Sequence, residues 1–200
     1  MKLKLVTGNE HKRDEFAAIL AGLGCPLDVE SLNPGAVRET GATYYQNAYR
    51  KARAGYLSEP AAAHEHVIVM ADDSGLELPE FGSILRVHSA RFTYAGFHER
   101  TALTAFLRDR QVSSTPARFV CWIVAFVPWH EGCFSVEGTA SGIVRAEPQG
   151  LEGFGYDPLF VPEGYSLTFA QMDASLKNRI SHRAVAAARL WSFVQETPGL

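Results

Sequence analysis

The sequence predicts an α/β fold built on a mixed β-sheet, in a chain whose 200 residues suit one domain or two tightly joined lobes. Three observations lead to this fold class. Short apolar strands alternate with amphipathic helices in the first half of the chain. Two long apolar segments follow each other across a short turn near the middle, which is typical of an antiparallel hairpin. A Gly-rich loop and a final amphipathic helix complete the pattern.

The individual elements follow from the spacing of apolar residues and from turn residues at their ends. In the first half, these patterns predict strands at 2–6, 27–32 and 67–70, and helices from Asn9 to Gly24 and at 43–57. In the second half, they predict an irregular segment at 79–96, helices at 98–108 and 181–194, strands at 117–127 and 133–144, and a loop at 150–158.

Composition excludes several classes of protein. Nineteen basic against 22 acidic residues give a net charge of −3, which argues against a general nucleic-acid binder and against an acidic disordered tail. The longest apolar run, 119–127, is too short to span a bilayer, and the N-terminus has no signal-peptide pattern. Cys25, Cys121 and Cys133 form no C-x-x-C pair and fit buried thiols. We therefore expect a cytoplasmic protein that binds neither membrane nor nucleic acid.

A candidate phosphate-binding turn lies at residues 7–12. Thr7 and Gly8 follow the first strand, and Asn9 is a good N-cap for the helix after it. Free N–H groups at a helix start bind phosphate, and Lys12 in the first turn makes more sense if it shares that anion. The alternative is a capped surface helix with a solvated lysine.

Two adjacent carboxylates, Asp72 and Asp73, follow the apolar run 67–70 and precede Ser74. On an extended backbone they point in opposite directions, so one can face a metal or water while the other braces a loop. Aspartate oxygens suit Mg²⁺, for which Glu39 is a second candidate ligand. Lys51 either reaches a phosphate or is simply solvated. The alternative for the aspartates is an Asp-rich turn.

Two later segments are candidates for recognition of a flat base. In the loop at 150–158, glycines flank Phe154 and Tyr156, either of which could stack on a base, while Tyr156 could equally plug the core. Residues 177–183 hold Lys177, with His182 and Arg183 at a helix start, where donors suit phosphate or purine carbonyl oxygens. The alternative is a basic surface patch.

Taken in order, these motifs resemble the inosine triphosphate pyrophosphatase family, from about residue 3 to residue 195. The matching stretches are T-G-N-x-x-K at 7–12, E-T-G at 39–41, A-D-D-S-G-L at 71–76, S-A-R at 89–91, G-F-G-Y-D-P-L-F at 153–160 and K-N-x-x-S-H-R at 177–183. The resemblance implies a single domain over residues 1–200 with a long mixed sheet, two lobes and a central substrate cleft. It also implies a homodimer that uses Mg²⁺ to hydrolyse ITP, dITP and XTP to the monophosphate and pyrophosphate.

The resemblance also assigns roles to residues. Thr7, Gly8, Asn9, Lys12 and Lys51 would bind the triphosphate, with Ser74 on the substrate. Asp73 would be the catalytic carboxylate and a metal ligand, with Asp72 as a second catalytic carboxylate and Glu39 as the other ligand. Phe154 would stack on the base within Phe154-Gly155-Tyr156-Asp157, all four counted as substrate-binding. Lys177, His182 and Arg183 would contact the base and its carbonyl oxygens, which would accept inosine and reject the amino group of adenine.

The chain departs from the family pattern at four places: Arg38, Gln46, residues 85–88 and Leu176. Three of these positions lack an acidic side chain that the family usually has. Two other functions stay open. A Maf-like pyrophosphatase would act on pyrimidine or modified nucleotides, against which the His182-Arg183 pair argues. A nucleotide-binding module without turnover is disfavoured because Lys12, Glu39, Asp72 and Asp73 are all present.

Overall fold

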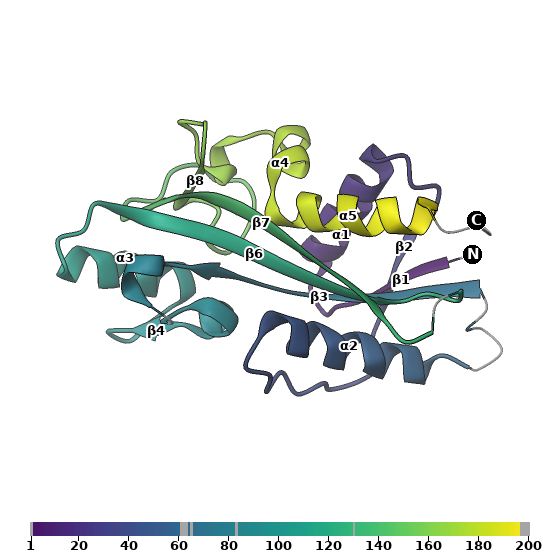
Figure 1. Ribbon diagram of the computed structural model, residues 1–200. Coiled ribbons are helices and arrows are strands. Elements are labelled where there is room, and N and C mark those ends of the chain that lie inside the picture. The colour runs from purple at the N-terminus through teal and green to yellow at the C-terminus, as the bar shows by residue number, and fades with distance from the viewer. Residues whose placement is uncertain (1, 61–63, 65, 83, 130, 197–200) are drawn as a thin grey trace. The chain divides into compact units, whose positions relative to one another are not determined.

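The chain folds into two compact units, seen in a computed structural model that describes residues 2–60, 64, 66–82, 84–129 and 131–196 (Figure 1). Unit 1 comprises Met1–Ser74, Cys121–Gly138 and Arg183–Leu200. Unit 2 comprises Gly75–Val120 and Thr139–His182.

Helices and strands follow each other largely as the apolar spacing predicts. The α-helices are α1 (Glu10–Gly22), α2 (Tyr44–Ser58), α3 (Glu99–Asp109), α4 (Ala174–Ile180) and α5 (His182–Glu196). The strands are β1 (Lys2–Val6), β2 (Val29–Leu32), β3 (Val67–Glu77), β4 (Thr93–Tyr94), β5 (Phe97–His98), β6 (Ser114–Phe126), β7 (Phe134–Arg145) and β8 (Phe160–Pro162).

The main sheet has the strand order β2-β1-β3-β6-β7-β8. Strand β1 pairs in parallel with both β2 and β3, whereas β7 and β8 are antiparallel, so the sheet is mixed. Strands β6 and β7 are neighbours joined by only a few residues, a connection too short for a parallel crossover. The predicted fold class and the central hairpin are therefore confirmed.

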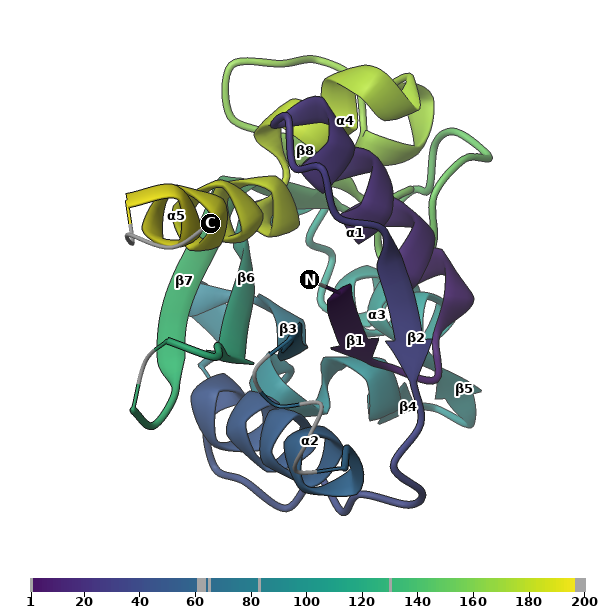
Figure 2. The same ribbon diagram turned by 90° about the vertical axis from the view of Figure 1, so that its right-hand side faces the viewer.

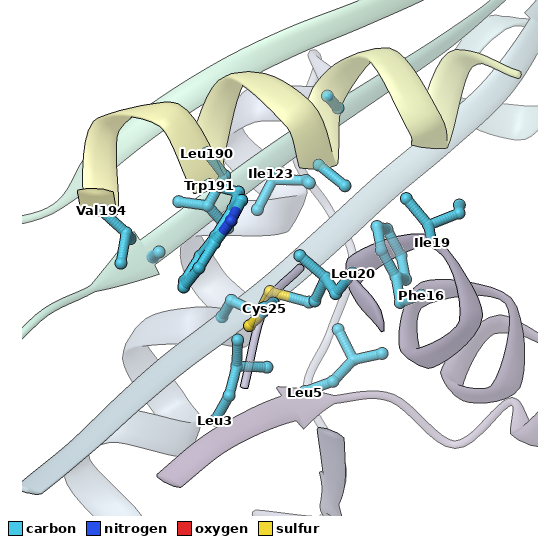
Figure 3. Close-up of a cluster of buried hydrophobic side chains, with 14 of the residues drawn as sticks. Leu3, Leu5, Phe16, Ile19, Leu20, Cys25, Ile123, Leu190, Trp191 and Val194 are labelled. Carbon is cyan, nitrogen blue, oxygen red and sulfur yellow. The ribbon is translucent and has the colours of Figure 1, made fainter. Parts of the chain in front are cut away.

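In unit 1, helices α1 and α5 cover one face of the sheet and α2 covers the other (Figure 2). Alternation along the strands divides the apolar side chains between two cores. Leu5 packs with residues of α1 and α5 (Figure 3). Ile68 and Met70 belong to the same core, while Val67 and Val69 pack against α2. The same alternation sends the next two residues of β3, both aspartates, to opposite faces.

Unit 2 has its own core, in which α3 packs with residues of β6, β7 and β8. Leu103 and Leu107 of α3 and Phe160 of β8 are fully buried there. The segment predicted to be irregular contains two 3-10 helices, at Pro79–Phe81 and Arg86–Arg91, and strand β4, which pairs with β5 directly after the segment. Leu85, one of the departures from the family pattern, is fully buried in this core.

Three expectations need correction. Strand β3 does not end at residue 70 but continues to Glu77, because the charges of Asp72 and Asp73 are neutralised by partners rather than by solvent. Strand β8 and helix α4 were missed because they are too short to show periodicity. Strand β2 begins at Val29 rather than at residue 27. Within the described part of the chain, no helix has the length and apolarity needed to cross a membrane.

Candidate active site

The turn after β1 has the geometry predicted for a helix start. The Oγ1 atom of Thr7 accepts a hydrogen bond from the N–H of Asn9 at 3.1 Å. The side chain of Asn9 in turn accepts from the N–H of Lys12 at 3.3 Å and caps α1. Gly8 and Asn9 are exposed, so the backbone at this helix start is accessible to an anion.

Asp72 lies on the face of β3 that α1 and α5 cover, and three side chains surround its Oδ2 atom. The Nζ atom of Lys12 lies at 2.8 Å, the hydroxyl of Ser74 donates at 2.5 Å, and the Nε atom of Arg183 lies at 3.9 Å. Asp72 is only 1% exposed. Burial alone would raise its pKa, but the positive charges of Lys12, Arg183 and Lys51 outweigh burial and hold the pKa well below its usual range.

Arg183 forms a second buried ion pair in unit 1. Its Nη1 atom lies 3.0 Å from Oε2 of Glu15 on α1, and both side chains are buried. The guanidinium therefore has a carboxylate partner and lies near Asp72. Its contact with a nucleotide base stays a prediction.

Asp73 lies on the opposite face of β3, against α2. Its Oδ1 atom is 3.2 Å from the Nζ atom of Lys51, and its Oδ2 atom accepts a hydrogen bond from the side-chain amide of Asn47 at 3.1 Å. The same Lys51 ammonium lies 2.7 Å from Oε1 of Glu39. One lysine therefore brings together the two carboxylates that were predicted to bind a metal.

The pKa values of both Asp73 and Lys51 are raised, but for different reasons. Burial raises the pKa of Asp73, and the attraction of Lys51 and the hydrogen bond from Asn47 offset only part of that rise. Burial would lower the pKa of Lys51, but the charges of Asp72, Asp73 and Glu39 raise it instead. Of the two aspartates, Asp73 is thus the better proton acceptor at neutral pH.

The donor set around Lys51 suits a hard divalent cation. Glu39 and Asp73 each direct a carboxylate oxygen at one positive charge, within about 3 Å. Mg²⁺ is commonly bound by one or two carboxylates together with substrate phosphates. Among the described residues no cluster of three or more His, Cys, Asp or Glu side chains could hold a metal. A two-carboxylate site whose remaining positions are filled by water or by phosphate oxygens fits this arrangement, whereas a closed site made by protein alone does not.

In unit 2, Asp157 organises the Gly-rich loop. Its Oδ2 atom accepts hydrogen bonds from the N–H of Phe154 at 2.8 Å and from Nζ of Lys177 at 2.9 Å. The Lys177 ammonium also lies 5.1 Å from the centre of the Phe154 ring. Asp157 and Lys177 are buried while Phe154 is half-buried, so this network fixes an aromatic side chain that keeps an accessible surface.

Two other predicted residues of unit 2 are held by the core. The ring of His182 stacks on Phe119, with centroids 4.6 Å apart and planes within 8° of each other. Tyr156 is buried, and its hydroxyl donates a 2.6 Å hydrogen bond to the backbone carbonyl of Ser89. The burial and hydrogen bond of Tyr156 favour the alternative in which its ring fills the core rather than stacks on a base.

The predicted residues thus form two groups, one in each unit. In unit 1 they are Thr7, Gly8, Asn9, Lys12, Glu39, Lys51, Asp72, Asp73, Ser74 and Arg183; in unit 2 they are Phe154, Gly155, Tyr156, Asp157, Lys177 and His182. The sequence analysis missed Glu15, Asn47 and Phe119. A signal existed for Asn47, which is four residues before Lys51 and shares its helix face.

Comparison with known proteins places these motifs in one family. A sequence model described as the Ham1 family matches residues 3–193. A dITP/XTP pyrophosphatase of Malacoplasma penetrans is 37% identical, over 98% of this chain and 99% of that protein.

Solved structures agree with the sequence comparison. The Ham1 protein of Staphylococcus aureus has a TM-score of 0.75 at 30% identity and covers 98% of both chains. A nucleoside-triphosphatase described as a dITP/XTP pyrophosphatase, from Mycobacterium abscessus, has a TM-score of 0.66 at 32% identity, over 97% of this chain and all of that one.

Proposed function

Because this chain belongs to the Ham1 family, we propose that it is a nucleoside triphosphate pyrophosphatase that removes dITP, XTP and ITP from the nucleotide pool. The products are the nucleoside monophosphate and pyrophosphate. The relatives named as dITP/XTP pyrophosphatases match it over nearly their whole length, which supports the same activity here.

One observation carries the proposal: Glu39 and Asp73 share the ammonium of Lys51. These two carboxylates would hold Mg²⁺. When bound, Mg²⁺ would supply a positive charge that offsets the negative charge of the triphosphate and of the pyrophosphate leaving group. The exposed start of α1, at residues 8–11, offers backbone N–H groups to the phosphates.

The two aspartates have different tasks in this proposal. Asp72 is fully engaged by Lys12 and Ser74, so it stays ionised and holds the Lys12 ammonium near the turn at residues 7–9. Asp73 has the raised pKa, so it orients the attacking water and takes up its proton. Lys12 and Lys51 stabilise the charge that develops on the phosphates.

The group in unit 2 is assigned to the base. Phe154 stacks on the purine, and the network from Asp157 to Lys177 keeps its ring in place. Lys177 and His182 provide N–H donors for the 6-carbonyl oxygen of inosine and xanthine. Adenine presents an amino group at that position, so a donor would meet a donor and binding is lost.

We also propose that the protein is a homodimer in the cytoplasm. The family resemblance implies a homodimer, which sedimentation equilibrium at several concentrations tests directly. The three cysteines are free thiols, which fits a reducing cytoplasm.

The experiment that tests the function is a comparison of pyrophosphate release from ITP, XTP, dITP, GTP, ATP and dTTP, with Mg²⁺ and with EDTA. We expect kcat/KM to be highest for ITP, XTP and dITP, and activity to disappear with EDTA. Equal activity on dTTP would contradict the purine assignment. Binding of ITP without turnover of any substrate would contradict the assignment as an enzyme.

A further inference from the structure

Asn47 is a buried side chain that joins two parts of the candidate metal site. It lies in the first turns of α2 and is 1% exposed. Its Oδ1 atom accepts a hydrogen bond from the N–H of Gly41 at 2.7 Å. Its Nδ2 atom donates to Oδ2 of Asp73 at 3.1 Å. One amide group therefore contacts both the loop that carries Glu39 and the strand that carries Asp73.

The chemistry of these partners fixes the orientation of the amide. The N–H of Gly41 can only donate, so the oxygen of Asn47 must face it. The amide nitrogen then faces Asp73, whose carboxylate can only accept when ionised, and donates one hydrogen bond to it. A flipped amide would place oxygen against oxygen and N–H against N–H. Because burial makes an unsatisfied polar group costly, the observed orientation is strongly favoured.

We propose that Asn47 is a positioning residue that sets the separation of the Glu39 and Asp73 carboxylates for a divalent cation. The inference rests on the proposed function for the identity of the metal site. Asn47 does not itself bind the metal or the substrate. Its amide holds residues 39–41 at a fixed distance from β3, and it restricts rotation of the Asp73 carboxylate.

The surroundings of Asn47 support a fixed geometry. Lys51 lies one helical turn further along α2 and contacts the other oxygen of Asp73, so both oxygens have a partner from the same helix. A side chain at Gly41 would not fit, because an added Cβ would lie 2.7 Å from Oδ1 of Asn47. The loop and the amide are thus packed in direct contact.

Gln46 offers a matched control within the same turn of α2. Its Oε1 atom accepts a hydrogen bond from the N–H of Ala42 at 2.7 Å, so it also holds the loop to the helix. The structure gives Gln46 no contact with Asp73. Gln46→Ala therefore loosens the loop by one hydrogen bond and leaves the link to Asp73 intact.

In the experiment, the nucleotide-free protein is titrated with Mn²⁺ alone. The electron paramagnetic resonance signal of the free ion measures how much Mn²⁺ stays unbound at each step. We expect Asn47→Ala to weaken Mn²⁺ binding by about ten-fold or more, as substitution of groups that orient metal ligands commonly does. Gln46→Ala should change the affinity less than two-fold, roughly the scatter expected for a site whose ligand orientation is untouched. Thr115→Val, which removes the hydrogen bond from the buried Thr115 hydroxyl to Glu80 in unit 2, controls for lost stability and should not alter the affinity.

A second variant keeps the test valid if Asn47→Ala does not fold. Gly41→Ala keeps every polar group but forces the loop away from Asn47, so it should also weaken Mn²⁺ binding. Wild-type affinity in Asn47→Ala or in Gly41→Ala overturns the inference, as does an equal loss in Gln46→Ala. A wild-type protein that binds no Mn²⁺ also overturns it.

Failure of the proposed function has a different signature. If the wild-type protein hydrolyses dITP but Asn47→Ala binds Mn²⁺ normally, the function stands and the positioning role fails. If the wild-type protein binds Mn²⁺ in the Asn47-dependent way but hydrolyses no nucleotide, the positioning role stands and the function fails. A positioning role further predicts that added Mg²⁺ partly restores the turnover of Asn47→Ala, which a general loss of stability would not allow.

Discussion

A methyl group added at Gly153 should disrupt the Gly-rich loop of unit 2, to which we assign base binding. Gly153 has a φ of +73°, and an added Cβ would lie 2.2 Å from Oδ2 of Asp157. That oxygen cannot move freely, because it accepts from both Phe154 and Lys177. A left-handed backbone costs a residue with a side chain about 1–2 kcal/mol, and a hydrogen bond to a charged group contributes about 1.5–3 kcal/mol. Gly153→Ala should therefore lower the free energy of unfolding by about 2.5–5 kcal/mol.

Gly155 provides the matched control in the same loop. Its φ is +58°, but an added Cβ would meet no atom within 4 Å. Gly155→Ala should therefore show only the backbone cost, about 1–2 kcal/mol. Urea denaturation of the two variants measures this difference.

The same pair of variants tests the role of Phe154. Base stacking contributes about 1–3 kcal/mol in nucleic-acid complexes, so Gly153→Ala should raise the KM for dITP roughly 5- to 150-fold. The affinity for Mn²⁺, a property of unit 1, should stay at the wild-type value. Equal losses of stability in the two variants would refute the steric argument. An unchanged KM in Gly153→Ala would place the base elsewhere.

Three further predictions concern β3 and the cysteines. Asp73→Asn should reduce turnover by about 10²–10⁴-fold, because the variant has no carboxylate to take up a proton from water. It should not lower the free energy of unfolding, because burial disfavours the ionised form of Asp73. Near-normal turnover would refute the role of Asp73. The pKa of Asp72 is lowered in the folded state, so its contribution to stability is present above its unfolded pKa of about 3.9 and is lost as the pH falls below it. Asp72→Asn should therefore flatten the acid limb of stability measured by urea denaturation, and an unchanged limb would contradict the shift. Burial raises the pKa of Cys121 to about 12, so at pH 8 Cys121 should react with Ellman's reagent only after denaturation. Cys133 is half-buried and should react in the native state. Peptide mapping that finds Cys121 labelled in the native state would contradict its burial.

Local patterns were sufficient to predict most of the fold. Apolar spacing placed α1, α2, α3 and α5, and the caps Asn9 and Thr43 lie at the predicted helix starts. The full length of strand β3, 11 residues, could not be predicted, because Asp72 and Asp73 interrupt the apolar run. Their charges are tolerated inside the sheet because Lys12, 60 residues away, and Lys51 neutralise them. Such long-range pairing leaves no local signal.

The same limit applies to the candidate site. Residue type and order were sufficient to nominate Lys12, Glu39 and Asp73, but not the partners that orient them. Asn47 contacts Gly41 and Asp73, and Glu15 contacts Arg183, but both side chains lie on helices whose apolar spacing gives no sign of these partners.

Two departures from the family pattern, at Gln46 and Leu176, also have local explanations. Gln46 keeps the acceptor atom that a glutamate would supply, since its Oε1 accepts from the N–H of Ala42. Leu176 packs against the core of unit 2, where an acidic side chain would be unfavourable without a partner. The departures at these two positions therefore leave the carboxylate pair of Glu39 and Asp73 unchanged.

The most direct test of the account is identification of the bond that the protein breaks. Phosphorus NMR of dITP incubated with the wild-type protein and Mg²⁺ distinguishes the possible products. We expect dIMP and pyrophosphate in equal amounts from the wild-type protein, and turnover reduced by about 10²–10⁴-fold in Asp73→Asn. Release of inorganic phosphate with dIDP, or hydrolysis by Asp73→Asn at the wild-type rate, would contradict the assignment of Asp73 and of the pyrophosphatase reaction.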